Sequence, residues 1–334
     1  MYSSIKTFIL FVLVLINQHT FSQTKRYRFS EQKMGSEFTI LLYHSDSNKA
    51  QIAASNAFKI ADSLNYSFSD YLINSEVSKL SKTAGTDQWV RVSADLMEII
   101  EKSNYAWIKS KGTFDITVGR LTKLWRKNKK DKKLPNQDSL KIALGTTGMK
   151  FVQINKNLGL IKLKKKGTQI DLGGIGKGFA AQKMLDYLKS QNITTALCDA
   201  AGNMAIGDAP PDTNGWNIAV QIPNKTQTLL NQMLQITNRS ISTSGDLYQY
   251  FEVNKKKYSH IINPKTGLGI TSQKQVTIIC ENATRADWLS TACCILPTKK
   301  ALNLAKKENA EILIIESKNH KMIQTKSKKF FRFS

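Results

Sequence analysis

The stretch Asp171-Leu-Gly-Gly-Ile-Gly-Lys-Gly178 joins a strand-like run at 159–163 to a helix-like segment at 179–190. Its four glycines allow the backbone to pass close to a bulky ligand. The change from strand to helix leaves free backbone N–H groups at a helix N-terminus, where phosphate groups bind well. The stretch lacks the Walker sequence and the glycine spacing of the Rossmann fingerprint. It predicts either a phosphate-binding turn, flanked by Asp171 and Lys177, or a plain glycine-rich turn.

The order of elements around this turn indicates the fold class. Strand-like patterns, for example at 34–43 and 276–280, alternate with helix-like patterns, for example at 49–66 and 282–296. The alternation lacks the regular rhythm of a Rossmann array. We predict an α+β fold in which helices pack on curved, mainly antiparallel sheets. The mature chain, 24–334, is expected to form one catalytic domain built from two intertwined α/β subdomains.

The first residues have the features of an export signal. Lys6 supplies a positive charge, and 8–16 form an apolar core that is too short to span a membrane comfortably. Residues 1–23 are therefore predicted to be a secretory signal peptide, with an uncleaved membrane anchor as the alternative. The mature protein is expected in the periplasm, in association with the outer face of the inner membrane.

The chain is strongly basic, with 49 Lys and Arg against 25 Asp and Glu and a net charge of +24. The densest basic run, at 123–133, is predicted to be an exposed loop. No basic helix-turn-helix, zinc-finger or RNP-type motif occurs in the sequence, so no nucleic-acid partner is expected. We interpret the basic run as a solvated surface that can face an anionic membrane or an acidic partner.

A small set of side chains could carry chemistry. Asp287 and Thr291 are four positions apart in the helix-like segment, so they share one face and could offer oxygen to Mg²⁺, although a structural pair has the same spacing. His260 is either a base or a structural hydrogen-bonding residue. The sequence contains no Gly-x-Ser-x-Gly elbow and no two-histidine metal motif. We therefore expect a site that works through a metal, backbone amides and a few side chains, which suits phosphoryl or nucleotidyl transfer.

Eight stretches, taken together and in order, resemble the FAD:protein FMN transferase family, also called the ApbE family. They span nearly the whole mature chain: Met34-Gly-Ser36, Phe68-Ser-Asp-Tyr-Leu-Ile-Asn-Ser-Glu76, Gly112-Thr-Phe-Asp-Ile-Thr-Val-Gly119, the glycine stretch 171–178, Ala200-Ala-Gly-Asn203, Ser242-Thr-Ser-Gly245, His260-Ile-Ile-Asn-Pro-Lys-Thr-Gly267 and Ala286-Asp-Trp-Leu-Ser-Thr291. Two positions depart from the family pattern. Asn263 stands where Asp is common before the proline, and Asn203 stands where Gly-Gly-Asp is common.

The resemblance implies an ApbE/T-fold-like architecture with the active site in a cleft between subdomains. It implies a Mg²⁺-dependent, exported enzyme that splits FAD and places FMN, through a phosphoester, on a Thr or Ser of a target flavoprotein, releasing AMP. The expected partners are FAD and an acceptor flavoprotein, a membrane-bound redox subunit that the basic run at 123–133 could help to dock. An FAD pyrophosphatase that forms FMN and AMP, and a non-catalytic periplasmic flavin-binding protein, are the alternatives.

The resemblance also implies a role for each matching residue. The FAD contacts are expected to be Met34, Tyr71, Thr113, Phe114, Asp115, Asp171, Lys177 and Ile261. The Mg²⁺ ligands are expected to be Gly174, through its backbone oxygen, and the side chains of Asp287 and Thr291. The catalytic residues are expected to be His260 as the base and Asp287 through the metal shell.

Overall fold

The computed structural model describes residues 24–334, except for 132, 224–228, 246–249, 255, 319–320 and 334. The predicted signal peptide, 1–23, lies outside the described residues. Within the described part, no helix combines the length and apolar character needed to cross a membrane.

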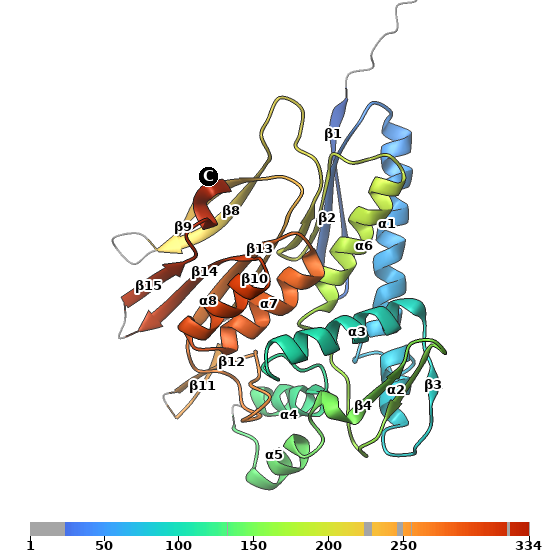
Figure 1. Cartoon of the computed structure of the whole chain (residues 1–334), viewed down its shortest axis with the longest axis vertical. Helices are drawn as coiled ribbons and strands as arrows, with labels where there is room; N and C mark the ends of the chain where they lie inside the picture. Colours follow the sequence, from blue (N-terminus) through green and yellow to red (C-terminus); the bar gives the residue numbers. More distant parts are fainter. Residues whose placement is uncertain are drawn as a thin grey trace, which may run out of the picture.

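One large sheet organises the described part of the chain (Figure 1). Its eight strands run in the spatial order β1-β2-β6-β7-β10-β13-β14-β15, and every neighbouring pair is antiparallel. The strands are β1 (Lys25–Lys33), β2 (Ser36–His44), β6 (Ala196–Ala200), β7 (Asn203–Ile206), β10 (Ser240–Gly245), β13 (Lys274–Cys280), β14 (Glu311–Lys318) and β15 (Lys321–Lys326). This confirms the predicted α+β class with mainly antiparallel sheets.

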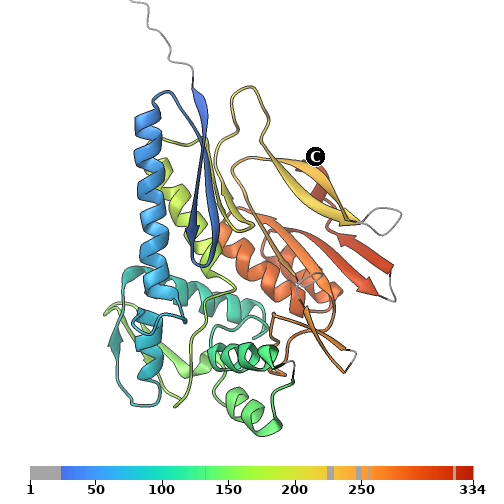
Figure 2. The ribbon, with the colours of Figure 1, turned by 180° about the vertical axis from the view of Figure 1, so that it is seen from behind.

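Four helices cover one face of the sheet: α1 (Ser47–Phe68), α6 (Gly176–Ser190), α7 (Ala283–Ile295) and α8 (Thr298–Lys307). Figure 1 shows them along one side of the strands, and Figure 2 shows the sheet from behind. Alanines at helical spacing on α1, such as Ala50, Ala54 and Ala57, are buried and allow close packing. The rings of Phe68 and Phe179 meet edge to face with centroids 5.5 Å apart, which joins α1 to α6.

The opposite face of the sheet is covered by a hairpin, β8 (Trp216–Pro223) and β9 (Leu229–Ile236), and by the short helix η2 (Phe330–Phe333). Strand β14 shows why both faces need cover. Ile312 and Ile314 belong to the core on the helical side, whereas Leu313 and Ile315 belong to the core under the hairpin. Successive residues of a strand point to opposite faces, so an uninterrupted apolar run indicates a strand buried on both sides.

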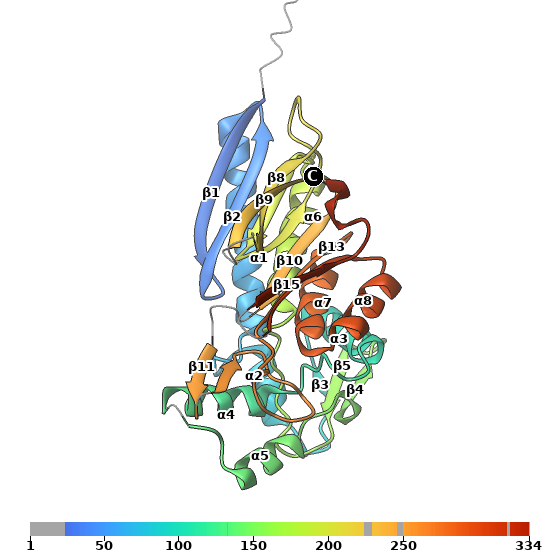
Figure 3. The same cartoon turned by 90° about the vertical axis from the view of Figure 1, so that its left-hand side faces the viewer.

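The remaining elements lie beyond the end of the main sheet, at the bottom of Figure 3. Strands β3 (Val90–Arg91), β5 (Leu160–Leu163) and β4 (Val152–Asn155) form a small antiparallel sheet, and β11 (Tyr250–Val253) pairs with β12 (Lys256–Ser259). The helices here are α2 (Glu76–Lys82), α3 (Ala94–Lys109), α4 (Gly119–Lys130), α5 (Gln137–Leu144) and η1 (Met149–Phe151). Helix α3 has a serine N-cap, because the Ser93 side chain accepts a hydrogen bond from the backbone N–H of Leu96.

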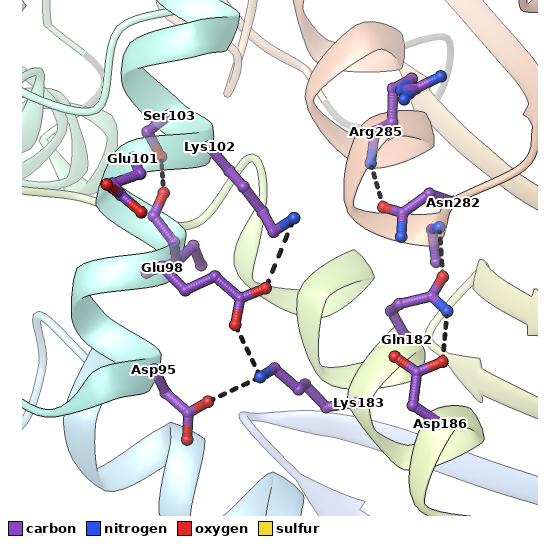
Figure 4. Close-up of polar contacts among 12 residues, drawn as sticks. Asp95, Glu98, Glu101, Lys102, Ser103, Gln182, Lys183, Asp186, Asn282 and Arg285 are labelled. Atoms are coloured by element: carbon purple, nitrogen blue, oxygen red, sulfur yellow. Dashed lines mark hydrogen bonds and ion pairs between the residues drawn. The ribbon is translucent and has the colours of Figure 1, made fainter. Parts of the chain in front are cut away.

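Helix α6 connects these two parts of the molecule through polar side chains (Figure 4). The Lys183 ammonium lies 3.1 Å from a carboxylate oxygen of Asp95 and 2.7 Å from one of Glu98, both on α3. On the neighbouring side, the Gln182 amide oxygen accepts a 2.9 Å hydrogen bond from the Ala283 backbone N–H, at the start of α7. Two consecutive residues of α6 therefore contact different helices: Lys183 contacts α3, and Gln182 contacts the first residue of α7. These contacts help to fix α7 beside the glycine turn.

One sequence prediction about local structure is wrong. Residues 123–130 of the basic run form no loop, because α4 continues through Lys130; its buried Leu121 and Trp125 give the helix an apolar side to pack. Tertiary packing of this helix outweighed a composition typical of loops. The hydroxyl-rich segment at 242–244 is part of β10, which pairs with both β7 and β13.

Candidate functional site

A cavity of about 630 Å³ opens where the glycine turn, α4, β10, α7 and the segment after β12 come together. Its volume is that of a typical cofactor site. The predicted site residues that line it are Tyr71, Thr113, Phe114, Asp115, Asp171, Gly174, Lys177, His260, Ile261, Asp287 and Thr291. Met34 is not among the lining residues; a Cβ placed on Gly176 would lie 3.9 Å from its Cε, so Met34 packs behind the turn.

The glycine turn lies directly against α7. The Gly178 backbone N–H donates a 2.8 Å hydrogen bond to Oδ2 of Asp287, 109 residues away in the chain. A Cβ on Gly178 would lie only 2.3 Å from the Ala283 carbonyl oxygen, and a Cβ on Gly174 would lie 3.3 Å from Oγ1 of Thr291. Only glycine permits this approach at 178, since a real Cβ does not occur so close to a backbone oxygen.

Asp287 is the most deeply buried acidic side chain of the cavity, with 3% of the residue exposed. Burial raises its pKa to about 6, although the Gly178 N–H and the charge of Lys177 act in the opposite direction. No described residue donates a hydrogen bond to its second oxygen, Oδ1. A buried carboxylate with one oxygen uncommitted at a cavity wall is suited to a cation.

Residues of β10 support the α7 side of the cavity through hydroxyl groups. Ser244 Oγ lies 2.7 Å from Ser290 Oγ and 3.3 Å from Thr291 Oγ1. Ser242 Oγ lies 3.1 Å from Ser290 Oγ and donates a 2.6 Å hydrogen bond to Asn203 Oδ1. This network holds Thr291 in place beside Asp287. It also accounts for the 242–245 stretch, whose strand register directs Ser242 and Ser244 to the same face.

His260 and Ile261 follow directly after β12, and hydrogen bonds at Ser259 hold the start of this segment in place. The Trp125 indole N–H donates a 3.1 Å hydrogen bond to the Ser259 carbonyl oxygen, and Ser259 Oγ accepts one from the Ile261 N–H at 3.0 Å. Ile261 is buried, whereas the His260 side chain is exposed at the cavity. A solvent-accessible imidazole at a cavity wall can meet an incoming acceptor group.

Asp115 is buried and has little capacity left for a ligand. Oδ1 accepts hydrogen bonds from the backbone N–H and the hydroxyl of Thr117, and Oδ2 accepts one from the Met149 N–H at 3.2 Å. Burial raises the pKa of Asp115, and these donors act against that rise. Its carboxylate thus organises the loop that presents Thr113 and Phe114 to the cavity, and Phe114 is buttressed by Trp288 of α7 at 6.2 Å between ring centroids.

Arg126 is a cavity residue that the sequence interpretation missed, because it was assigned to the solvated basic run. Thr122, Trp125, Arg126 and Lys129 are spaced at i, i+3, i+4 and i+7 on α4 and all line the cavity. That spacing was the available signal, since it places four side chains on one helical face. The exposed Lys123, Lys127 and Lys130 lie outside this lining.

The fold and the site define a class of enzyme, the flavin transferases. The apo structure of a Pseudomonas stutzeri flavinyl transferase ApbE is similar to this chain with a TM-score of 0.83 and 25% identity, over 93% of this chain and 97% of that one. The ApbE protein from Thermotoga maritima gives a TM-score of 0.82 and 27% identity, over 92% and 99% of the two chains.

Sequence comparison assigns the family. A model described as the ApbE family matches residues 34–314. The FAD:protein FMN transferase of Buchnera aphidicola is 32% identical over 252 residues, which cover 74% of each protein. The enzyme of that name from Treponema pallidum is 31% identical over 247 residues, covering 69% of this chain and 67% of its own. The chain belongs to the ApbE family.

Proposed function

We propose that this protein transfers the FMN part of FAD to a Thr or Ser hydroxyl of an acceptor flavoprotein. The acceptor oxygen would form a bond to the phosphorus of the FMN half, the bond from that phosphorus to the bridging oxygen would break, and AMP would leave. The observation that carries the proposal is the buried Asp287 carboxylate held against the glycine turn, at the wall of a cavity large enough for a dinucleotide. Membership of the ApbE family supports it.

The residues present fit a Mg²⁺ ion. Asp287 offers the uncommitted Oδ1, Thr291 offers a hydroxyl, and the backbone at Gly174 lies next to that hydroxyl. These are hard oxygen donors of the kind that Mg²⁺ prefers. When bound, Mg²⁺ would neutralise a pyrophosphate and polarise the phosphorus–oxygen bond that breaks.

Side chains of the cavity supply the remaining chemistry. Lys177 lies in the first turn of α6, where its ammonium and the nearby backbone N–H groups favour negative charge. It has no ion-pair partner among the described residues, so its charge is available to a phosphate oxygen. His260, exposed at the same cavity, would take the proton from the acceptor hydroxyl as that oxygen attacks.

Replacing His260 with glutamine is expected to slow FMN transfer by about 10²- to 10⁴-fold, the range found for loss of a general base. FAD binding should stay within about threefold of wild type, because the base acts on the acceptor rather than on FAD. Single-turnover transfer rates and a separate FAD titration would measure the two effects. A variant that binds FAD normally and transfers at the wild-type rate would remove His260 from the mechanism.

Removal of the metal is expected to stop transfer reversibly. The mature protein would be incubated with FAD and an acceptor domain in Mg²⁺, in EDTA, and in EDTA followed by excess Mg²⁺. UV-fluorescent acceptor and mass spectrometry of its peptides should reveal FMN on a Thr or Ser only in the first and third samples. Free FMN and AMP without labelled acceptor would indicate a pyrophosphatase, and intact FAD in Mg²⁺ would indicate a flavin carrier.

The cellular setting is also a proposal. The signal-like sequence at 1–23 supports export to the periplasm, at the outer face of the inner membrane. The acceptor would be a membrane-bound redox flavoprotein. The exposed lysines of α4, at 123, 127 and 130, could contact the anionic membrane surface or that acceptor while the opposite side of the helix lines the cavity.

A further inference from the structure

Arg126 of α4 joins two segments at the cavity that are distant from it in sequence. Its Nη1 lies 2.7 Å from Oδ2 of Asp70, in the turn after α1, and its Nη2 lies 3.1 Å from Oδ2 of Asp171, in the glycine stretch. The two aspartates are 56 and 45 residues away from Arg126 in the chain. The guanidinium carbon also lies 4.2 Å from the centre of the Tyr71 ring. One side chain of α4 therefore touches the turn, the ring and the glycine stretch.

The two carboxylates depend on this arginine. The side chains of Asp70 and Asp171 are each only 9% exposed, so solvent screens them poorly. Each carboxylate faces the other across the guanidinium, and like charges at low exposure repel. With the arginine present, the planar fork satisfies both at once. Without it, the two carboxylates would lose their common partner, and the turn after α1 would lose its link to the glycine stretch.

The same contact orients Tyr71. Tyr71 is an exposed residue with 76% of its surface accessible to solvent, so little else in the fold restrains the ring. The guanidinium of Arg126 lies over the ring, and an arginine stacked on an aromatic face is attractive at exposed sites. A ring already held at the cavity loses less entropy when a flat ligand stacks on it.

We propose that Arg126 is a positioning residue that sets the affinity of the cavity for FAD, by holding Tyr71 and Asp171 in their binding positions. This inference rests on the proposed function, since it takes FAD as the ligand. Asp171 uses Oδ1 to accept the Gly173 N–H at 2.8 Å and Oδ2 to accept Arg126, so its geometry is set from both sides. Arg126 needs no contact with the reacting phosphorus to act in this way.

The test is an FAD titration of the full mature protein in Mg²⁺ without acceptor, followed by flavin fluorescence. Arg126→Gln is expected to weaken FAD binding about tenfold, while the transfer rate at saturating FAD stays within about twofold of wild type. Arg126→Lys, which keeps the charge but loses the planar fork, should weaken binding about threefold. Lys127→Gln is the matched control: it removes one positive charge from the next, exposed position of α4 and should bind as wild type does.

A double-mutant cycle tests whether Arg126 acts through Tyr71. Because the two residues would form one unit, Tyr71→Ala combined with Arg126→Gln should weaken binding less than the product of the single effects. Equal FAD affinity of Arg126→Gln and wild type would overturn the inference. An equal loss in Lys127→Gln would do so too, because it would show a general charge effect. If wild type binds FAD without transferring FMN, the proposed function fails, yet the affinities still decide the role of Arg126.

Discussion

Asparagine in place of Asp287 is expected to lower FMN transfer by about a thousandfold or more and, at the same time, to stabilise the metal-free protein above pH 6. The amide keeps the size of the side chain and can still accept the Gly178 N–H through its oxygen. It removes the negative charge that would hold Mg²⁺. In the metal-free protein the same charge lowers the free energy of unfolding, because Asp287 is buried and has no ion-pair partner among the described residues.

The pH dependence of this stabilisation follows from the direction of the pKa shift. Asp287 titrates near 3.8 when unfolded and at about 6 when folded. The unfolded chain therefore releases its proton first, and the folded state loses stability as pH rises from about 4 through 6. Ionisation of Asp287 should lower the free energy of unfolding by about 2 to 3 kcal/mol by the linkage relation. This loss should be complete above pH 6 and absent well below pH 4. Asparagine does not titrate, so the variant should lack this component.

Chemical unfolding in EDTA at several pH values would measure the difference, with transfer measured separately in Mg²⁺. Asp186→Asn is a suitable control, because Asp186 is an exposed carboxylate on α6 outside the cavity. It should leave transfer unchanged and should not show the Asp287 stability profile. Wild-type transfer by Asp287→Asn would refute the metal assignment, and a variant less stable than wild type at pH 8 would refute the electrostatic account of the buried carboxylate.

Alanine at Gly178 is expected to be the most damaging single-carbon change in the glycine turn. The new Cβ would lie 2.3 Å from the Ala283 carbonyl oxygen and 2.6 Å from the Asp287 Cβ. Both neighbours belong to the rigid body of α7, so the turn must move away from the helix. We expect a loss of about 3 kcal/mol or more in the free energy of unfolding. Transfer should fall about a hundredfold or more in the protein that still folds, because the proposed Mg²⁺ ligands would separate.

Gly176 provides the matched control, two residues earlier at the start of the same helix. A Cβ there would meet nothing closer than 3.9 Å, which is ordinary van der Waals contact. Gly176→Ala should therefore stay within about 1 kcal/mol of wild type in stability and keep its activity, since alanine favours a helix over glycine. Denaturant unfolding and transfer assays on both variants make the comparison. Similar behaviour of the two variants would show that close packing against α7 does not decide the requirement for glycine.

Local sequence signals predicted the parts of the site that depend on neighbouring residues. The glycines of 171–178 indicated a close backbone approach, and the spacing of Asp287 and Thr291 indicated a shared helical face; the structure places the two features in contact. Whether these residues act in catalysis stays a prediction. The two intertwined subdomains also remain an interpretation of the fold.

The basic run was mispredicted because amino-acid composition indicates whether a segment prefers solvent, but not where the segment lies in the fold. The lysines around Arg126 resemble a solvated loop, yet a helix forms there because Leu121 and Trp125 have a core to bury against. Asp115 lines the cavity, and its role as an FAD contact stays a prediction; no local pattern could indicate that its oxygens accept hydrogen bonds from Thr117 and Met149.

By itself the sequence determined the α+β class, the family and a set of site residues of which all but Met34 line the cavity, because these follow from short-range spacing and from motifs that keep their order along the chain. Only the tertiary structure decided what each polar group contacts. The Asp287–Gly178 hydrogen bond and the Arg126 ion pairs join segments that are at least 45 residues apart. The uncommitted oxygen of Asp287 matters because that side chain is buried. Charge and hydrogen-bonding capacity acquire a function only when packing excludes water and sets the distances between such groups.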